Sequence, residues 1–320
     1  MVAAQPTGSS FVSTATTPLE DILPWSISKA ATVIVNDSVQ SDGRFVLYQH
    51  VASLYGSSSS RDASPQSHLP RVVWISGGPL TPRLIAKTLR KMGCDKASSY
   101  SQQQATNAPT SPDGMLSTEN AHCTIRCLAA EIAEQEDADN YDLSDMEAFI
   151  KKVYQQTREW AARGSSEAAT DWIILDDVST LAVLVGERLV WMLIQSLHAL
   201  SRKTQNFGLL VRCMNDRDQE MYRSLVSGED SATLSTSWVG AGGSQKNDKR
   251  LDTGTDIVPW ERSLVELADV LVDVSPLLTG ATKDAHGRLV FTWTEDGGVR
   301  QSSYNYCVTD NRVLGIPIRR

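Results

Sequence analysis

Short apolar runs rich in valine, isoleucine and leucine recur along the chain and are separated by segments with a helical period. The runs are too short for helices and lack polar alternation, so they predict strands buried on both faces of a sheet. They occupy residues 32–36, 71–76, 172–176, 207–212 and 270–274, with a weaker candidate at 123–127. The segments between them predict helices at 45–55, 82–92, 144–163, 187–203 and 259–268. This alternation is typical of a mostly parallel sheet with helices on both faces.

The hydrophobic period changes to 2 near the C-terminus. Alternating segments at 289–293, 303–308 and 313–317 are joined by turn residues and predict an antiparallel meander. An α/β core that ends in antiparallel strands is the organisation of RecA-like ATPase domains. The predicted fold class is therefore α/β, with a RecA-like mostly parallel sheet, helices on both faces and a C-terminal antiparallel β meander.

Two apolar segments are expected to pack against other apolar surfaces. The helix predicted at 187–203 is apolar on most sides, so we expect it to lie against the sheet and a second element. Near the N-terminus, Leu19, Ile22, Leu23 and Trp25 can cover one apolar patch, which predicts a short docking segment.

Polar stretches interrupt the pattern and set the expected organisation of the 320 residues. We expect an N-terminal tail over 1–28 and a single RecA-like domain over 29–320. Flexible inserts are expected at about 56–70, 96–118 and 214–256, because these stretches are rich in serine, glycine, glutamine and other polar residues. The remainder contains enough apolar residues to form a core.

Charge and cysteine usage narrow the function classes. A formal net charge of −8 argues against a chain that grips nucleic acid by itself. The five cysteines are irregularly spaced, which argues against a disulfide framework, and Cys123 with Cys127 lacks the second pair of a zinc site. Because the second cysteine pair is missing, we expect no metal. No leader peptide or long apolar run is evident, so we expect an intracellular soluble protein.

The run Trp172-Ile173-Ile174-Leu175-Asp176-Asp177 resembles the second signature of a P-loop ATPase, in which a buried strand delivers an aspartate to magnesium. Three interpretations remain open for Asp176 and Asp177. They can bind a metal or orient water, they can cap the next helix, or they can serve as the acid and base of an enzyme.

The phosphate loop that such a site requires, G-x-x-x-x-G-K-[ST], is degenerate. After the first strand, Ser38 stands at the position of the first glycine and Gly43 keeps the second. Arg44 replaces the lysine, and Phe45 replaces the hydroxyl that would hold magnesium. We therefore expect no nucleotide hydrolysis by this chain alone and no bound cofactor.

A basic cluster in the last insert is a candidate nucleic-acid contact. Lys246, Lys249 and Arg250 follow a predicted central strand, whose loop would face the pore in a ring of RecA-like domains. They are candidates for phosphate contacts, although a solvated insert explains the same residues.

Three segments resemble the family of the sixth subunit of the Elongator complex. The first corresponds to the family's D-G-x-F-L-x-x-H, the second to its apolar-D-D-L-S-x-L and the third to its L-x-T-G-x-x-x-D-V-H-G-x-L. In this chain they are 42–50, 173–181 and 278–289, and their order and spacing hold from about residue 30 to the C-terminus. The inserts at 96–118 and 214–256 have no counterpart.

The resemblance implies a RecA-like subunit without working nucleotide motifs and without independent catalysis. It implies assembly with the fourth and fifth Elongator subunits into a hetero-hexameric ring. That ring binds tRNA and supports the modification of wobble uridine U34, while other Elongator subunits carry the chemistry. It also implies a cytoplasmic location, with the nucleus as a second one. The remaining alternatives are another RecA-like pseudo-ATPase, such as the fifth Elongator subunit or a recombinase accessory protein, and the acid–base enzyme described above.

Overall fold

The computed structural model describes most of the predicted core and leaves the predicted inserts largely outside the described residues. The described residues are 16–23, 30–38, 40–56, 70–92, 94, 123–133, 143–163, 170–214, 260–277, 280, 282, 284–295, 298–309 and 312–318. Gly56 ends a helix and Met214 ends a strand, so these two residues belong to regular elements. The other residues of the predicted inserts, apart from residue 70, lie outside the described residues.

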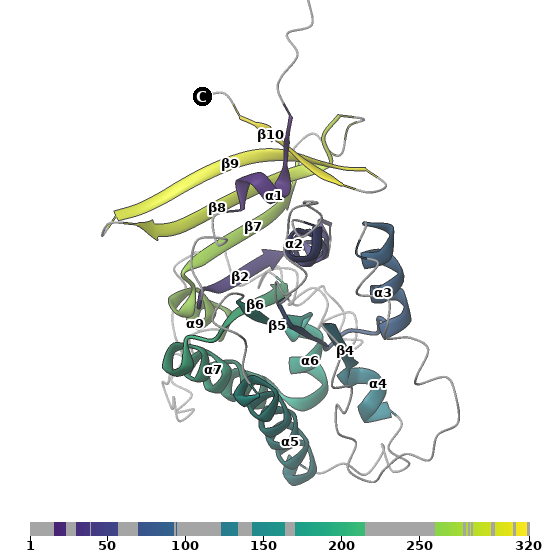
Figure 1. Cartoon of the computed structure of the whole chain (residues 1–320), viewed down its shortest axis with the longest axis vertical. Helices are drawn as coiled ribbons and strands as arrows, with labels where there is room; N and C mark the ends of the chain where they lie inside the picture. Colours follow the sequence, from purple (N-terminus) through teal and green to yellow (C-terminus); the bar gives the residue numbers. More distant parts are fainter. Residues whose placement is uncertain are drawn as a thin grey trace, which may run out of the picture.

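One sheet of ten strands runs through the described part of the chain, in the order β1-β10-β9-β8-β7-β2-β6-β5-β3-β4 (Figure 1). The strands are β1 (Thr17–Pro18), β2 (Thr32–Asp37), β3 (Val72–Ser76), β4 (Cys123–Cys127), β5 (Asp171–Asp176), β6 (Phe207–Met214), β7 (Val270–Pro276), β8 (Gly287–Glu295), β9 (Gly298–Val308) and β10 (Val313–Pro317).

The strand directions divide the sheet into two parts. Every pairing from β4 to β7 is parallel, and every pairing from β7 to β1 is antiparallel. The six parallel strands can be numbered from first to sixth by their position in the chain. Across the sheet from β4 to β7, their order is then third, second, fourth, fifth, first and sixth. A parallel core with this order, extended by an antiparallel meander, is the RecA-like arrangement. The predicted fold class is confirmed.

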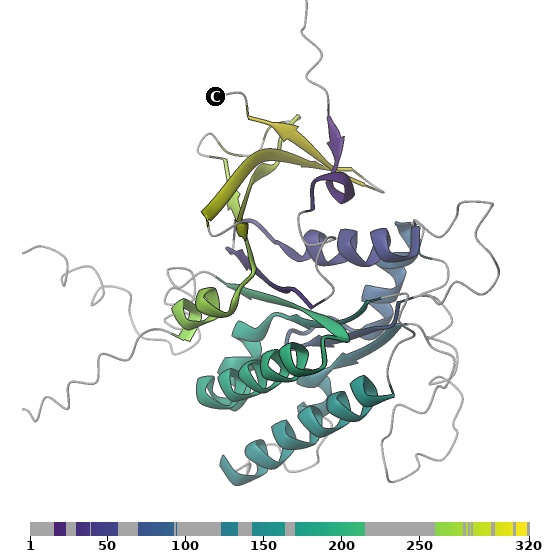
Figure 2. The ribbon, with the colours of Figure 1, turned by 60° about the vertical axis from the view of Figure 1, so that its left-hand side comes forward.

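Helices cover both faces of the parallel part, as Figure 2 shows. One face carries α1 (Leu19–Ile22), α2 (Arg44–Gly56) and α3 (Pro82–Lys91), and the other carries α4 (Leu128–Ala133), α5 (Leu143–Ala162), α6 (Val178–Val185), α7 (Glu187–Thr204) and α9 (Trp260–Leu267). None of the described helices combines the length and the apolar character that crossing a bilayer requires.

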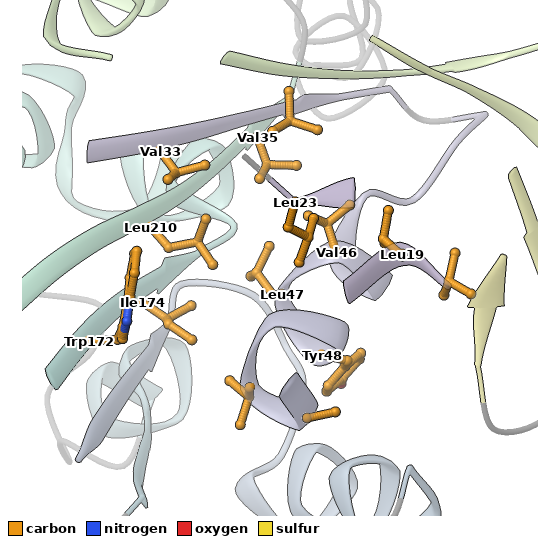
Figure 3. Packing of buried hydrophobic residues seen from close by; sticks show 14 of the residues in the cluster. Leu19, Leu23, Val33, Val35, Val46, Leu47, Tyr48, Trp172, Ile174 and Leu210 are labelled. Atoms are coloured by element: carbon orange, nitrogen blue, oxygen red, sulfur yellow. The ribbon is translucent and has the colours of Figure 1, made fainter. Parts of the chain in front are cut away.

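Alternate residues of each central strand enter separate hydrophobic clusters on the two faces. From β5, Trp172 and Ile174 pack toward α2, whereas Ile173 and Leu175 pack toward α6 and α7. Figure 3 shows the first of these clusters, with side chains from β2, β5, β6, α1 and α2 meeting. Burial on both faces explains why these strands are continuous apolar runs.

The two apolar segments singled out in the sequence find their partners within the chain. Helix α7 lies against β6, α5 and α6, and only Met192 among its large apolar side chains stays exposed. The segment 17–23 packs on the sheet that it precedes: β1 pairs with β10, and Leu19 and Leu23 are buried in the first cluster. Residues 17–23 of the predicted tail are therefore continuous with the predicted domain.

Candidate functional site

The loop after β2 is closed by its own hydrogen bonds. The backbone of Ser38 pairs with that of Ser41, and their hydroxyl oxygens lie 2.7 Å apart. Gly43 N donates to Asp37 Oδ2 at 2.7 Å, and Arg44 N donates to Asp42 Oδ1 at 2.9 Å. A phosphate loop binds anions through free backbone N–H groups. Here the N–H groups of residues 38, 41, 43 and 44 already have acceptors within the loop.

Gly43 lies close against β2 at the end of this loop. A Cβ at this position would lie 3.0 Å from the Asp37 Cβ and 3.1 Å from a Val35 methyl. The absence of a side chain thus lets the loop return against β2. Asp42 occupies the anion position at the N-terminus of α2, where the helix dipole favours a negative group.

Arg44, at the position of the missing lysine, reaches across the edge of the sheet to the second degenerate signature. Its Nε donates to Asp176 Oδ2 at 3.0 Å, and its Nη2 lies 3.8 Å from Asp177 Oδ2. Its Nη1 also lies 3.4 Å from Asp42 Oδ2. The structure therefore brings the two signatures together, as an ATPase would, but joins them by ion pairs.

Arg212 is the residue that sequence reasoning missed. It extends from β6, which lies between β2 and β5, and its side chain is 6% exposed. Its Nε donates to Asp176 Oδ1 at 2.6 Å and its Nη1 to Asp37 Oδ2 at 2.7 Å. Its Nη1 and Nη2 lie 3.7 and 3.5 Å from Asp42 and Asp177, respectively. A charged residue within the apolar run 207–213 was the available signal, because a buried charge requires a partner.

Burial and charge perturb the ionisation of this network. Burial by itself would lower the pKa of the Arg212 guanidinium, but the carboxylates of Asp176 and Asp37 outweigh it and raise the pKa, so Arg212 stays charged. Burial raises the pKa of Asp37 to about 6, and its contacts with Arg212 and Gly43 N offset only part of that effect. Asp37 Oδ1 has no hydrogen-bond partner among the described residues.

Asp177 has the structural role that one interpretation assigned to it. It is the N-cap of α6, and its Oδ1 accepts a hydrogen bond from Thr180 N at 3.2 Å. Its backbone is left-handed, with φ of 59°. The loop after β3 packs tightly against Asp177, since a Cβ on Gly78 would lie 2.5 Å from Asp177 Oδ2.

Phe45 and the cysteines also lie in packing positions. The Phe45 ring centroid is 4.6 Å from that of Tyr306 on β9, so the side chain is turned toward the meander.

Burial, with a smaller contribution from Cys94, raises the pKa of Cys123 to about 12, which disfavours its thiolate as a ligand. Cys127 Sγ donates to the Gly78 carbonyl. Within the described residues, no group of three or more His, Cys, Asp or Glu side chains is arranged to hold a metal ion.

Ion pairs thus join the degenerate phosphate loop to the second degenerate signature and to β6, through Asp37, Asp42, Arg44, Asp176, Asp177 and Arg212. We call these six residues the Arg–Asp network. Its four carboxylates outnumber its two guanidinium groups, so its formal charge is negative and opposes binding of a triphosphate. The predicted basic contacts Lys246, Lys249 and Arg250 lie outside the described residues and stay a prediction.

No family model and no curated protein matches this chain. Among solved structures, it is similar to an isolated ATPase domain, with 10% identity over 91% of this chain and 86% of that one, at a TM-score of 0.49. It is also similar to a KaiC-like protein from Pyrococcus horikoshii OT3, with 8% identity over 90% of both chains and a TM-score of 0.43. A third match is a DnaB-like replicative helicase, with 11% identity over 89% of this chain and 57% of that one, at a TM-score of 0.45.

The fold assignment rests on the strand order. Strand order and site together define a RecA-like domain in which arginine and aspartate side chains join the loop after β2 to the ends of β5 and β6.

Proposed function

We propose that this chain is a non-catalytic subunit of the Elongator complex. In this proposal it assembles with the fourth and fifth subunits into a hetero-hexameric ring of RecA-like domains. The ring binds tRNA and supports the modification of wobble uridine U34, in the cytoplasm and also in the nucleus. The chain provides ring structure and tRNA handling, and other subunits provide the chemistry.

The observation that carries the non-catalytic part is the Arg–Asp network. A P-loop site needs free N–H donors, a lysine and a metal ligand around the phosphates. Here the N–H groups of residues 38, 41, 43 and 44 have acceptors within the loop, and Arg44 is held by Asp176. The same network disfavours an acid–base enzyme, because Asp176 is fully buried and both of its oxygens accept hydrogen bonds from arginines.

Support for the Elongator part comes from the three motif segments. Two of them meet in space: Asp42-Gly43-Arg44 and Asp176-Asp177 are joined through Arg44. The third segment leads into β8, beside β7 in the antiparallel part of the sheet. Motifs that lie apart in the sequence but share one ion-pair network are consistent with a single family pattern.

Co-expression with the fourth and fifth Elongator subunits tests the proposal. The expected result is one complex containing all three chains in equal numbers, with a mass near that of a hexamer by light scattering after size-exclusion chromatography. A matched sample without the fourth and fifth subunits defines the elution of the chain alone. A stable chain that elutes separately from both subunits would exclude the Elongator assignment, and assembly with a different RecA-like partner would favour the other pseudo-ATPase alternative.

A further inference from the structure

Two buried carboxylates face one guanidinium at the edge of the parallel sheet. Asp37 on β2 and Asp176 on β5 belong to strands that flank β6 on either side, and Arg212 extends from β6 between them. The side chains of Asp37 and Asp176 are 2% and 0% exposed. Two carboxylates so far from solvent are costly unless a cation lies between them.

The contact geometry matches a planar guanidinium. Nε and Nη1 of Arg212 donate to two different carboxylates, at 2.6 and 2.7 Å. A guanidinium holds its donors in a fixed fork, whereas an ammonium is a compact point charge. The oxygen of Asp37 that accepts from Arg212 also accepts from Gly43 N. The cation therefore also orders the loop after β2.

We infer that Asp37 and Asp176 form a cation-binding site whose permanent occupant is the Arg212 guanidinium, and that this occupant holds residues 40–43 of the loop after β2 in one arrangement without a nucleotide. In a P-loop ATPase, a lysine, a metal ion and the phosphates join the phosphate loop to the second strand. Here a cation attached to the neighbouring strand makes that connection. The loop of this subunit then has no nucleotide-dependent state to cycle through.

Arg71 provides a matched comparison within the chain. Its Nε and Nη2 both donate to Oδ2 of Asp171, at 3.0 and 2.6 Å. Among the described residues this arginine pairs with one carboxylate, its guanidinium lies on the Trp160 ring, and its side chain is 23% exposed. Asp171 is 3% exposed, so loss of Arg71 leaves one buried carboxylate without its arginine, whereas loss of Arg212 affects two.

Chemical complementation of the isolated full chain tests the inference. We expect Arg212→Ala to lower the melting temperature by on the order of 10 °C, because it leaves the buried Asp37 without its arginine and Asp176 with Arg44 alone. Millimolar guanidinium chloride should restore part of that loss, while equal urea or sodium chloride should not. Arg71→Ala should lower the melting temperature less and should not respond to guanidinium.

A second experiment neutralises one of the two carboxylates. In Asp37→Asn/Arg212→Ala, the response to guanidinium should disappear, because one wall of the site is neutral. A wild-type melting temperature for Arg212→Ala, or the same guanidinium response in Arg71→Ala, would overturn the inference.

Arg212→Lys keeps the experiment decisive where the alanine variant does not fold. It retains the charge but loses the fork, so it should fold with a melting temperature below that of wild type. A lysine variant as stable as wild type would show that any cation in this place suffices and would overturn the guanidinium site. The measurement concerns this chain alone, so its outcome is separate from that of the assembly experiment.

Discussion

Arg44 Nε donates to Asp176 Oδ2 at 3.0 Å, although the two residues are 132 positions apart in the chain. This bond joins the segment in place of a phosphate loop to the segment in place of the second ATPase signature. In a working site, the groups at these two positions would hold opposite sides of a nucleotide–metal complex. Here Arg44 and Asp176 pair directly with each other.

Restoring the missing phosphate-loop residues should not restore nucleotide binding. Arg44→Lys/Phe45→Thr returns the lysine and the hydroxyl, but Arg212 stays between Asp37 and Asp176, and Gly43 N stays bound to Asp37. We expect no heat of binding for Mg·ATP in titration calorimetry and no hydrolysis, as for wild type and for Arg44→Lys alone. Specific binding by the double variant would show that the site is open to nucleotides.

Asp37 should give the stability a distinctive pH dependence. Burial raises its pKa from 3.8 to about 6. Because the folded pKa lies above the unfolded one, the stability linked to this carboxyl is fully present below pH 3.8 and is lost as the pH rises through about 6.

Asp37→Asn removes this dependence. The free energy of unfolding of the variant relative to wild type should therefore rise between pH 4 and 7, by up to about 3 kcal/mol, since one pKa unit is about 1.4 kcal/mol. Urea titrations across that range measure it, with Asp284→Asn, an exposed site, as the control. A constant difference between variant and wild type would contradict the raised pKa.

The two glycines after β3 should be sensitive to alanine. A Cβ at Gly77 would lie 2.5 Å from the backbone oxygen of Asp177, and one at Gly78 would lie 2.5 Å from its Oδ2. Both substitutions should destabilise the chain, by about 1–3 kcal/mol. Gly77→Ala should cost more, because the Asp177 backbone is fixed at the start of α6, whereas its carboxylate can shift at the cost of its contacts with Thr180 N and the arginines. Thermal melts of both variants check the order, and a neutral Gly77→Ala would contradict the close approach.

The prediction for Lys246, Lys249 and Arg250 concerns the assembled ring. Replacing all three with alanine should weaken tRNA binding to a similar degree across different tRNAs, because phosphate contacts carry no sequence information. The salt dependence should flatten by up to about 0.9 log unit for each phosphate that is no longer neutralised. Filter binding at several salt concentrations measures both. Unchanged affinity and salt slope in a normally assembled triple variant would assign the cluster to a solvated insert.

Element positions could be predicted because the local pattern and the fold agree. The helix expected at 187–203 is Glu187–Thr204, and the strand expected at 172–176 is Asp171–Asp176. The helix expected at 144–163 is Leu143–Ala162, so both of its ends lie one residue earlier than predicted.

The role of Arg212 could not be predicted in the same way. A charge in an apolar strand indicates a partner, but its identity depends on which strands flank β6, and β2 and β5 are far from it in sequence. The degenerate loop was visible from Ser38, Arg44 and Phe45. Which side chains contact the degenerate loop depends on the order of the strands in the sheet.

The position of β2 in the sheet has a consequence for synthesis. β2 comprises residues 32–37, but its two neighbours are β6 at 207–214 and β7 at 270–276. On the ribosome, this apolar strand emerges long before either hydrogen-bonding partner exists. Long-range pairings of this kind slow folding and leave strand edges exposed to aggregation in the interval. We therefore expect nascent chains truncated before residue 207 to depend on chaperones more strongly than chains that include β6 and β7.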